Sequence, residues 1–355
     1  PVRRSFLPAL ALLAATGAGC GGCRDRSVPP RPKAVVLVTI DTLRADAVSF
    51  APNGPDTTPF LATLAADGIV FDAAYAPSSW TAPSMASLFT GLEAKSHGVV
   101  RGAMSARRPD GSQIAVNQRV LPASLPTLAE SFRAGGFRTV GVAANRHLAR
   151  DLGFAQGFES YLDDAPFLDA DEVNREVLAA LTAVFGADAG QGWKQQPTFL
   201  WIHYFDPHVP YEAREPWVDT FAGPASDART AAGLGFPELV ARYDGRAAAA
   251  QRDLEPLYLS EVRFVDEHLR ALDATLGLTD PDVLVVVTSD HGEEFGEHGG
   301  LGHGTTLYEE AVRVPLLVRW PARLPQGVRS PAPVSLIDVF PTLAALLGLE
   351  PPAAA

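Results

Sequence analysis

Residues 34–46 have the sequence AVVLVTIDTLRAD, and this stretch decides the fold. Its first seven residues are apolar or β-branched without a break, which is typical of a strand buried on both faces of a sheet. Similar runs recur at 137–145, 198–205, 282–290 and 314–320. The sequence therefore predicts a set of buried strands, of which residues 34–40 form the first.

Helical spacing of apolar residues separates these strands. The predicted helices cover residues 58–67, 83–90, 124–134, 171–186, 258–276 and 335–347. Strands that alternate with helices predict an α/β fold with a mostly parallel sheet, covered by helices on both faces. Residues 212–256 are rich in Ala, Gly and Arg and carry no strand pattern, so we interpret them as an insertion or lid, partly helical.

The charge of the chain narrows its possible ligands. A net charge of −12 and a pI near 5.1 argue against nucleic acid, which requires a basic face. Only three of the 29 basic residues are lysines. An anionic substrate would therefore need a metal ion, arginine or histidine to offset its charge.

The N-terminal residues have the pattern of an export signal. Residues 3–20, RRSFLPALALLAATGAGC, combine a basic start, an apolar run and small residues before Cys20. We interpret residues 1–23 as a lipoprotein signal with Cys20 as the lipidated residue, and residues 24–33 as a Pro-rich tether. The alternative is a plain secretory signal. Either way we expect an exported protein, and the lipoprotein interpretation places it in a bacterial cell envelope, periplasmic or on the outer surface.

Acids and histidines follow three of the predicted strands. Asp41 follows the first, Asp206 and His208 follow the strand at 198–205, and Asp290 and His291 follow the strand at 282–290. Because ligands gather outside the carboxyl ends of parallel strands, these side chains can converge on one metal ion. A lone Asp after a strand is more commonly a turn or helix cap.

Residues 78–91, SSWTAPSMASLFTG, predict a helix that opens at Thr81 and closes at Gly91. A hydroxyl at a helix N-terminus sits where free amides and the helix dipole favour an anion. Thr81 is therefore a candidate nucleophile beside a metal. A simple helix cap is the alternative, and the two roles are compatible.

Several stretches together resemble the sulfatase family of the alkaline phosphatase superfamily. They are VVLVTIDTLRAD, TPFLATLAADGIVFDAAYAPSSWTAPSMASLFTGLEAKSHGV, GFAQGFESY, HYFDPHVPY, TSDHGEEFGEHG and GHGTTLYEEAVRVPLLVRWP. The resemblance covers roughly residues 34–345, in the family's order. It implies a three-layer α/β/α sandwich over residues 34–350, a divalent metal and a covalent intermediate on the nucleophile. Sulfatases usually continue into a small C-terminal subdomain, which we expect to be reduced or missing here.

The nucleophile motif departs from the family pattern. Sulfatases oxidise a Cys or Ser followed by x-Pro-Ser-Arg to formylglycine, whereas this chain has Thr81-Ala82-Pro83-Ser84-Met85. Threonine carries a methyl group on its carbinol carbon, so its oxidation cannot yield an aldehyde. Thr81 resembles instead the nucleophile of phosphodiesterases and of phosphoethanolamine or phosphoglycerol transferases in the superfamily.

The metal pocket changes in the same direction. Many sulfatases place two acids after the first strand and Asp-Asn after the later one, a calcium set, but here Asp41-Thr42 and Asp290-His291 stand there. We expect Asp41, Asp290, His291 and Thr81 to hold one divalent ion, with zinc or manganese favoured over calcium by the imidazole.

A second set of residues is expected near the transferred group. His303 lies close to where sulfatases carry a substrate-binding Lys. With His208 it is expected either to contact the transferred group, as a catalytic residue, or to complete a second metal site. Asp206 either joins them there or caps a helix. We expect Arg44 to brace its loop, and we assign no role to His203.

These observations predict a metal-dependent hydrolase that cleaves a sulfate ester or, as Thr81 favours, a phosphate mono- or diester. Its substrate would be a small, glycan-linked or lipid-linked anionic ester. One alternative is a phosphoethanolamine or phosphoglycerol transferase acting on envelope glycans; such enzymes commonly carry several membrane spans, which the sequence after residue 23 does not show. Another is an inactive relative that binds an anion, suggested by Met85 in place of Arg.

Overall fold

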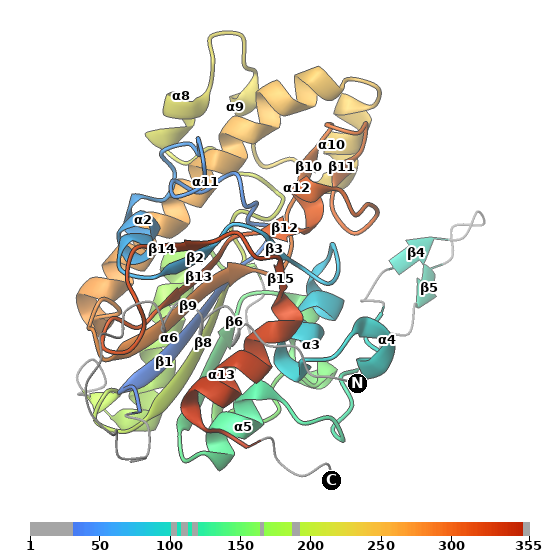
Figure 1. Ribbon diagram of the computed structural model, residues 1–355. Helices are drawn as coiled ribbons and strands as arrows, with labels where there is room; N and C mark the ends of the chain where they lie inside the picture. Colours follow the sequence, from blue (N-terminus) through green and yellow to red (C-terminus); the bar gives the residue numbers. More distant parts are fainter. Residues whose placement is uncertain are drawn as a thin grey trace.

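The computed structural model describes residues 31–100, 105–107, 113–115, 120–163, 167–186 and 192–350. The expected signal at 1–23, with Cys20, lies outside these residues. At the centre is an eight-stranded sheet in the order β14-β2-β13-β9-β1-β8-β6-β7 (Figure 1). Its strands are β1 (Ala34–Ile40), β2 (Ile69–Phe71), β6 (Arg138–Ala143), β7 (Ser160–Leu162), β8 (Thr198–Tyr204), β9 (Val283–Ser289), β13 (Leu316–Arg319) and β14 (Val328–Ser330).

Strand β1 lies inside this sheet and pairs in parallel with both of its neighbours, β8 and β9. Strands β6 and β7 continue the parallel part on one side. On the other side β13 runs antiparallel to both β9 and β2. The prediction of a mostly parallel sheet is confirmed.

Helices cover both faces of the sheet, which makes the three-layer sandwich that the resemblance implied (Figure 1). Helices α2 (Pro59–Ala66), α6 (Ala170–Phe185) and α11 (Ala247–Leu276) pack on one face, and α3 (Thr81–Thr90), α5 (Leu128–Ala134) and α13 (Val339–Leu347) pack on the other. Strand β1 shows the cause, since Val36 and Val38 enter the first core while Val35 and Leu37 enter the second. A strand buried on both faces must be apolar at every position.

The other elements are short. Two-residue or three-residue strands form small separate pairs and a three-stranded ribbon: β3 (Ala74–Tyr75), β4 (Ser105–Arg107), β5 (Gln113–Ala115), β10 (Glu294–Phe295), β11 (Leu301–Gly302), β12 (Arg313–Val314) and β15 (Val334–Ser335). The short helices are α4 (Ala94–His97), α8 (Trp217–Phe221), α9 (Ala228–Ala231), α10 (Phe236–Tyr243) and α12 (Glu309–Val312), with 3-10 turns at Arg146–Leu148, Arg150–Leu152 and Leu336–Asp338.

The segment 212–256 is partly helical, as predicted: it contains α8, α9 and α10 and runs into the long helix α11. That helix begins at Ala247, not near residue 258 as predicted, because four consecutive alanines favour helix ahead of Pro256. Leu239, Tyr243 and Ala250 belong to the core that covers one face of the sheet. In the part of the chain that the structure describes, no helix is both long enough and apolar enough to span a membrane.

Candidate active site

The polar residues that follow the central strands meet at one edge of the sheet. The last residue of β1, Ile40, is in register with Tyr204 of β8 and with Ser289 of β9. Asp41 therefore leaves the sheet beside Asp290 and His291, and all three side chains are fully buried. The amide of Thr42 donates to Asp290 Oδ1 at 3.3 Å, which ties the two strand ends together.

Thr81 lies at the first residue of helix α3, directly against this group. The residue at the N-cap is Trp80, in extended conformation and without a side-chain cap bond, so Thr81 is not the cap of its helix. Its side chain is buried, and Oγ1 lies 3.3 Å from His291 Nε2 and 3.5 Å from the Asn145 amide nitrogen. The hydroxyl thus points at the strand ends.

Three acceptor atoms converge around His291, and the Thr81 hydroxyl is the one hydrogen-bond donor to them among the described residues. His291 Nδ1 lies 2.9 Å from the carbonyl oxygen of Gly292, which requires an N–H there and leaves Nε2 with a free lone pair. That nitrogen lies 3.6 Å from Asp41 Oδ1 and 3.3 Å from Asp290 Oδ2. Neither carboxylate oxygen has a hydrogen-bond partner among the described residues. Two unpartnered carboxylate oxygens that converge with an imidazole lone pair fit a divalent cation.

The electrostatics of the site agree with this fit. Burial, followed by the neighbouring Asp41 charge, raises the pKa of Asp290 to about 7. Burial also raises the pKa of Asp41, and it holds the pKa of His291 well below its usual range. Two buried carboxylates therefore lie close together where burial disfavours their negative charge, and a bound cation would remove that cost.

Two residues without an assigned role belong to this group. His203 Nε2 lies 3.4 Å from Asp41 Oδ2, and ligand atoms of His203, Asp41 and Asp290 all fall within 4.8 Å of one another. The amide of Asn145 donates to Asp41 Oδ2 at 2.5 Å. Asn145 is the last residue of the predicted strand at 137–145, and His203 lies near the end of the predicted strand at 198–205. Their position near strand ends is the feature of the sequence that could have identified them as site residues.

His303 and His208 lie beside the acceptor group. The ring centroids of His303 are 4.4 Å from His291 and 4.9 Å from His208. His303 Nδ1 bonds Glu293 Oε1 at 2.9 Å, and Tyr211 donates to the other oxygen of Glu293 at 2.9 Å. Burial opposes protonation of His303, but the Glu293 carboxylate outweighs it and raises the pKa of His303 to about 9. His303 is therefore protonated at neutral pH and forms an ion pair with Glu293.

Asp206 has a structural environment instead. One carboxylate oxygen accepts from the amide of Ala170 at 2.8 Å, at the first residue of α6, and the other accepts from Arg214 at 3.2 Å. Both oxygens are therefore engaged. The bond to the Ala170 amide agrees with the prediction that Asp206 caps a helix. Because both of its oxygens are engaged, Asp206 is a poor candidate for a second metal site with His208 and His303.

Arg44 braces the loop after β1. Its guanidinium bonds Asp46 at 2.8 Å and Glu297 at 2.5 Å, and its backbone amide donates to the Tyr258 hydroxyl at 2.8 Å. Met85, which stands where sulfatases carry Arg, is fully buried in the core between α3 and the sheet. It supplies packing where the family pattern has a charged group.

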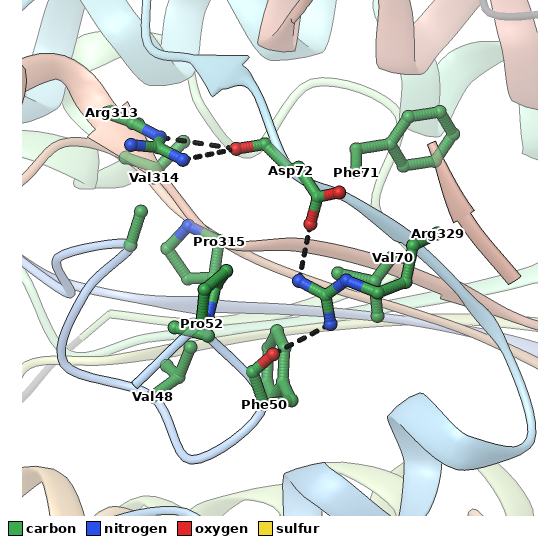
Figure 2. A pocket seen from close by; sticks show the side chains of 12 residues that line it. Val48, Phe50, Pro52, Val70, Phe71, Asp72, Arg313, Val314, Pro315 and Arg329 are labelled. Carbon is green, nitrogen blue, oxygen red and sulfur yellow. Dashed lines mark hydrogen bonds and ion pairs between the residues drawn. The ribbon is translucent and has the colours of Figure 1, made fainter. Parts of the chain in front are cut away.

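Two cavities differ in what they can hold. Figure 2 shows a cavity of about 20 Å³ near β12 and β14, where Arg329 pairs with Asp72 and donates to the Phe50 carbonyl, and Arg313 donates to the Asp72 carbonyl. It holds no more than a water molecule, and both guanidinium groups are already engaged. A cavity of about 330 Å³ lies instead at the start of α3, lined by Trp80 and Pro83 on either side of Thr81 in the sequence.

A second cluster of potential metal ligands follows His291 in the sequence. It consists of Glu294 in β10, His298 after that strand, and Glu310 in α12. His298 Nδ1 bonds Glu310 Oε1 directly at 2.5 Å. Glu294 accepts from the amides of His298 and Gly300 and from the Thr306 hydroxyl. These carboxylates have donors, so the cluster lacks the unpaired acceptors found around His291.

The sequence matches known proteins along most of its length. The family model described as Sulfatase matches residues 33–349. The chain is 25% identical to an uncharacterized sulfatase, YidJ, of Escherichia coli, covering 91% of this chain and 69% of that protein. It is 30% identical to human arylsulfatase A, covering 91% of this chain and 65% of that protein. The chain thus spans about two thirds of the length of these relatives.

Solved structures show the same fold. The phosphonate monoester hydrolase of Agrobacterium radiobacter matches with a TM-score of 0.67 and 22% identity, over 90% of this chain and 74% of that one. The phosphonate monoester hydrolase of Silicibacter pomeroyi matches with a TM-score of 0.62 and 22% identity, over 90% and 74%. At this identity the likeness concerns the fold.

Proposed function

The chain belongs to the sulfatase family and is a sulfatase-like ester hydrolase, and from this premise we propose that Thr81 is its nucleophile. The observation that supports the proposal is the position of the Thr81 hydroxyl, 3.3 Å from His291 Nε2 at the N-terminus of α3. An arriving sulfate or phosphate ester could meet there the backbone amides of Thr81 and Ala82, because Pro83 has no N–H and the Ser84 amide bonds the Trp80 carbonyl. Threonine cannot be oxidised to formylglycine, so we expect its own hydroxyl to make the attack that the formylglycine makes in sulfatases.

The residues of the chain divide the work. Attack by Thr81 Oγ1 forms a bond to phosphorus or sulfur and breaks the ester bond to the leaving oxygen; water later cleaves the Thr81 ester. Asn145 holds the Thr81 hydroxyl and the Asp41 carboxylate in place. His303, charged beside Glu293, offsets part of the negative charge of the transferred group. His208 lies beside His303 as a neutral contact, because burial lowers the pKa of His208.

Sulfatases are metal-dependent, and the acceptor group fits a metal. We propose that Asp41, Asp290 and His291 hold one divalent ion with Thr81 as a further ligand, and His203 lies close enough to join them. An imidazole among the ligands favours zinc or manganese over calcium. When bound, such an ion would acidify a coordinated hydroxyl and polarise the ester oxygens.

The proposal favours phosphorus over sulfur. A panel of 4-nitrophenyl sulfate, 4-nitrophenyl phosphate, bis(4-nitrophenyl) phosphate and a phosphonate monoester separates the choices. We expect the phosphorus esters to give the larger kcat/KM, because threonine cannot form the formylglycine aldehyde with which sulfatases cleave sulfate esters. Faster turnover of the sulfate ester would overturn this preference, and no turnover of any ester would favour the inactive anion-binding alternative.

Acid-quenched enzyme offers a second measurement that identifies the nucleophile. During turnover, mass spectrometry of the peptide that contains Thr81 should show an added phosphoryl or sulfuryl group. An adduct on another residue would move the nucleophile away from Thr81.

The location of the protein is a separate proposal. We propose that residues 1–23 direct export and that Cys20 carries a lipid that anchors the chain to a bacterial envelope membrane, on the periplasmic or outer side. What supports it is the basic, then apolar, then small-residue pattern that ends at Cys20. The substrate would then be an anionic ester present outside the cytoplasm.

A further inference from the structure

The cavity of about 330 Å³ beside Thr81 has a chemistry of its own. Its walls come from the segment that enters α3, from the region of α4, and from the loop after His303. Thr81 and His303 do not line the cavity themselves, but the residue before Thr81, Trp80, and the residue after His303, Gly304, do. Its volume falls at the lower end of the roughly 300–1,000 Å³ typical of ligand pockets. It can therefore take a group about the size of one ring.

The lining of this cavity is polar but uncharged. Among the described residues that line it, none carries a charge. Its polar groups are the hydroxyls of Ser78, Ser79, Thr305 and Thr306 and the indole N–H of Trp80, and Leu307 adds an apolar side chain. A leaving group that carried a second sulfate or phosphate would need a cation at this place, and an uncharged hydroxyl-bearing or aromatic group would not.

Trp80 is the large surface in this lining. It is half-buried, and the edge of His147 packs on it with ring centroids 5.1 Å apart and an interplanar angle of 62°. A Cβ built on Gly304 would lie 3.6 Å from Trp80 Cβ, so the loop after His303 passes close to the base of the Trp80 side chain. Among the described residues the indole N–H has no hydrogen-bond partner, and it is free to meet a ligand. Tryptophan held in this way offers a rigid apolar face with a polar edge.

We propose that this cavity is the leaving-group subsite and that it selects esters whose leaving group is a single uncharged ring stacked on Trp80. The proposal rests on the proposed function, because it takes Thr81 as the point of attack. It excludes esters of polyanionic leaving groups, such as heavily sulfated glycan segments, from the good substrates.

The test compares binding of three phosphonates to the metal-loaded protein by calorimetry. Phenylphosphonate and methylphosphonate share the anionic group and differ in the ring. We expect phenylphosphonate to bind about tenfold more tightly in the wild type, and we expect Trp80→Ala to remove that difference while methylphosphonate binds as before. 4-Carboxyphenylphosphonate should lose the advantage of the ring in the wild type, because its charge enters an uncharged pocket.

A gain-of-function variant keeps the proposal falsifiable if Trp80→Ala disturbs folding. Leu307 is 75% exposed, so Leu307→Arg should fold normally and should improve binding of 4-carboxyphenylphosphonate. Trp217→Ala on α8 and Val240→Arg on α10, both outside the lining, are the matched controls and should change nothing.

Three outcomes would overturn the subsite: equal binding of the phenyl and methyl compounds, an unchanged ring preference in Trp80→Ala, or tightest wild-type binding of the carboxyphenyl compound. Binding does not require turnover. A protein that shows the ring preference but forms no adduct on Thr81 would therefore contradict the proposed function, and the cavity would stand as a ring-binding pocket without the leaving-group role.

Discussion

The side-chain amide of Asn145 lies 2.5 Å from Asp41 Oδ2. Its orientation is determined, because Asn145 Oδ1 accepts from the backbone amide of His147 at 2.8 Å and only the NH₂ group can then face the carboxylate. The same nitrogen lies 3.5 Å from Thr81 Oγ1. Asn145, two residues after the end of β6, therefore connects the proposed metal ligand Asp41 to the proposed nucleophile Thr81.

We expect Asn145→Ala to lower kcat by about two orders of magnitude, the usual cost of losing one preorganised donor. Metal content should be retained, since Asn145 supplies no ligand atom. Steady-state kinetics and metal analysis of the purified variant measure both. Asn174→Ala, which removes a donor to the His268 carbonyl and an acceptor of the Tyr204 hydroxyl but no contact with Asp41 or Thr81, serves as the control and should leave kcat unchanged. Full activity in Asn145→Ala would contradict the positioning role.

For Thr81→Ala we expect a loss of at least about three orders of magnitude in turnover. Stability should fall by less than the roughly 1 kcal/mol of a lost helix cap, because Trp80 and not Thr81 occupies the N-cap. Thr81→Ser should keep partial activity, since it preserves the hydroxyl. Turnover assays and urea unfolding separate the two effects. Near-wild-type turnover in the Ala variant would refute the nucleophile assignment.

Removal of the metal should destabilise the fold, because Asp41 and Asp290 would then face each other in the interior. We expect a chelator to lower the melting temperature and zinc or manganese to restore it. Asp290→Asn should weaken this response strongly. Glu310→Gln, in the second ligand cluster, is the matched control and should not. Stoichiometric calcium in the purified protein would contradict the preference for zinc or manganese.

The buried His97 should make stability depend on pH. Its Nδ1 accepts from the Val99 amide at 3.1 Å, so its Nε2–H donates to Ser87 Oγ at 2.9 Å and no site is left for a second proton. Burial lowers the pKa of His97 to about 4, below its ordinary value of 6.5. As pH falls through that interval the unfolded chain binds the proton first, and stability declines until about pH 4.

The measurement is the free energy of unfolding in urea at several pH values between about 7 and 4, for the wild type and for His97→Gln. Other titrating groups act on both proteins, so their difference isolates His97. We expect the variant to be less stable at pH 7 and to lose less stability on acidification. Parallel curves for the two proteins would show that His97 does not titrate in this way.

Cys20→Ser tests the proposed anchor. A single lipidated residue would hold the chain, so the full-length variant, expressed with its signal in a bacterial host, should move from the membrane fraction to the soluble fraction. Cys23→Ser, three residues away, is the control and should stay with the membrane. If Cys20→Ser still fractionates with membranes, the lipoprotein interpretation is wrong.

Local pattern was sufficient for the strands and for part of the site. The run at 34–40 is apolar at every position because both of its faces are covered, and this shows in the sequence without knowledge of its neighbours. Asp41, Asp290 and His291 were predictable for the same reason: they follow such runs, and parallel strands end at a common edge. The predicted start of α11, near residue 258, was about ten residues too late, because tertiary packing and a run of alanines extend the helix toward the N-terminus beyond Pro256.

The buried strands, the family and the strand-end acids can thus be read from the chain alone, since they are properties of short consecutive stretches. Only the tertiary structure decided that β8 and β9 flank β1, which brings His203 to Asp41 across 162 residues, and that Asn145 reaches Asp41 across 104. It also decided the charge of His303, through its buried bond to Glu293. The physical reason is that hydrogen bonds and pKa shifts depend on distance and on exclusion of water, and both are set by which segments pack together.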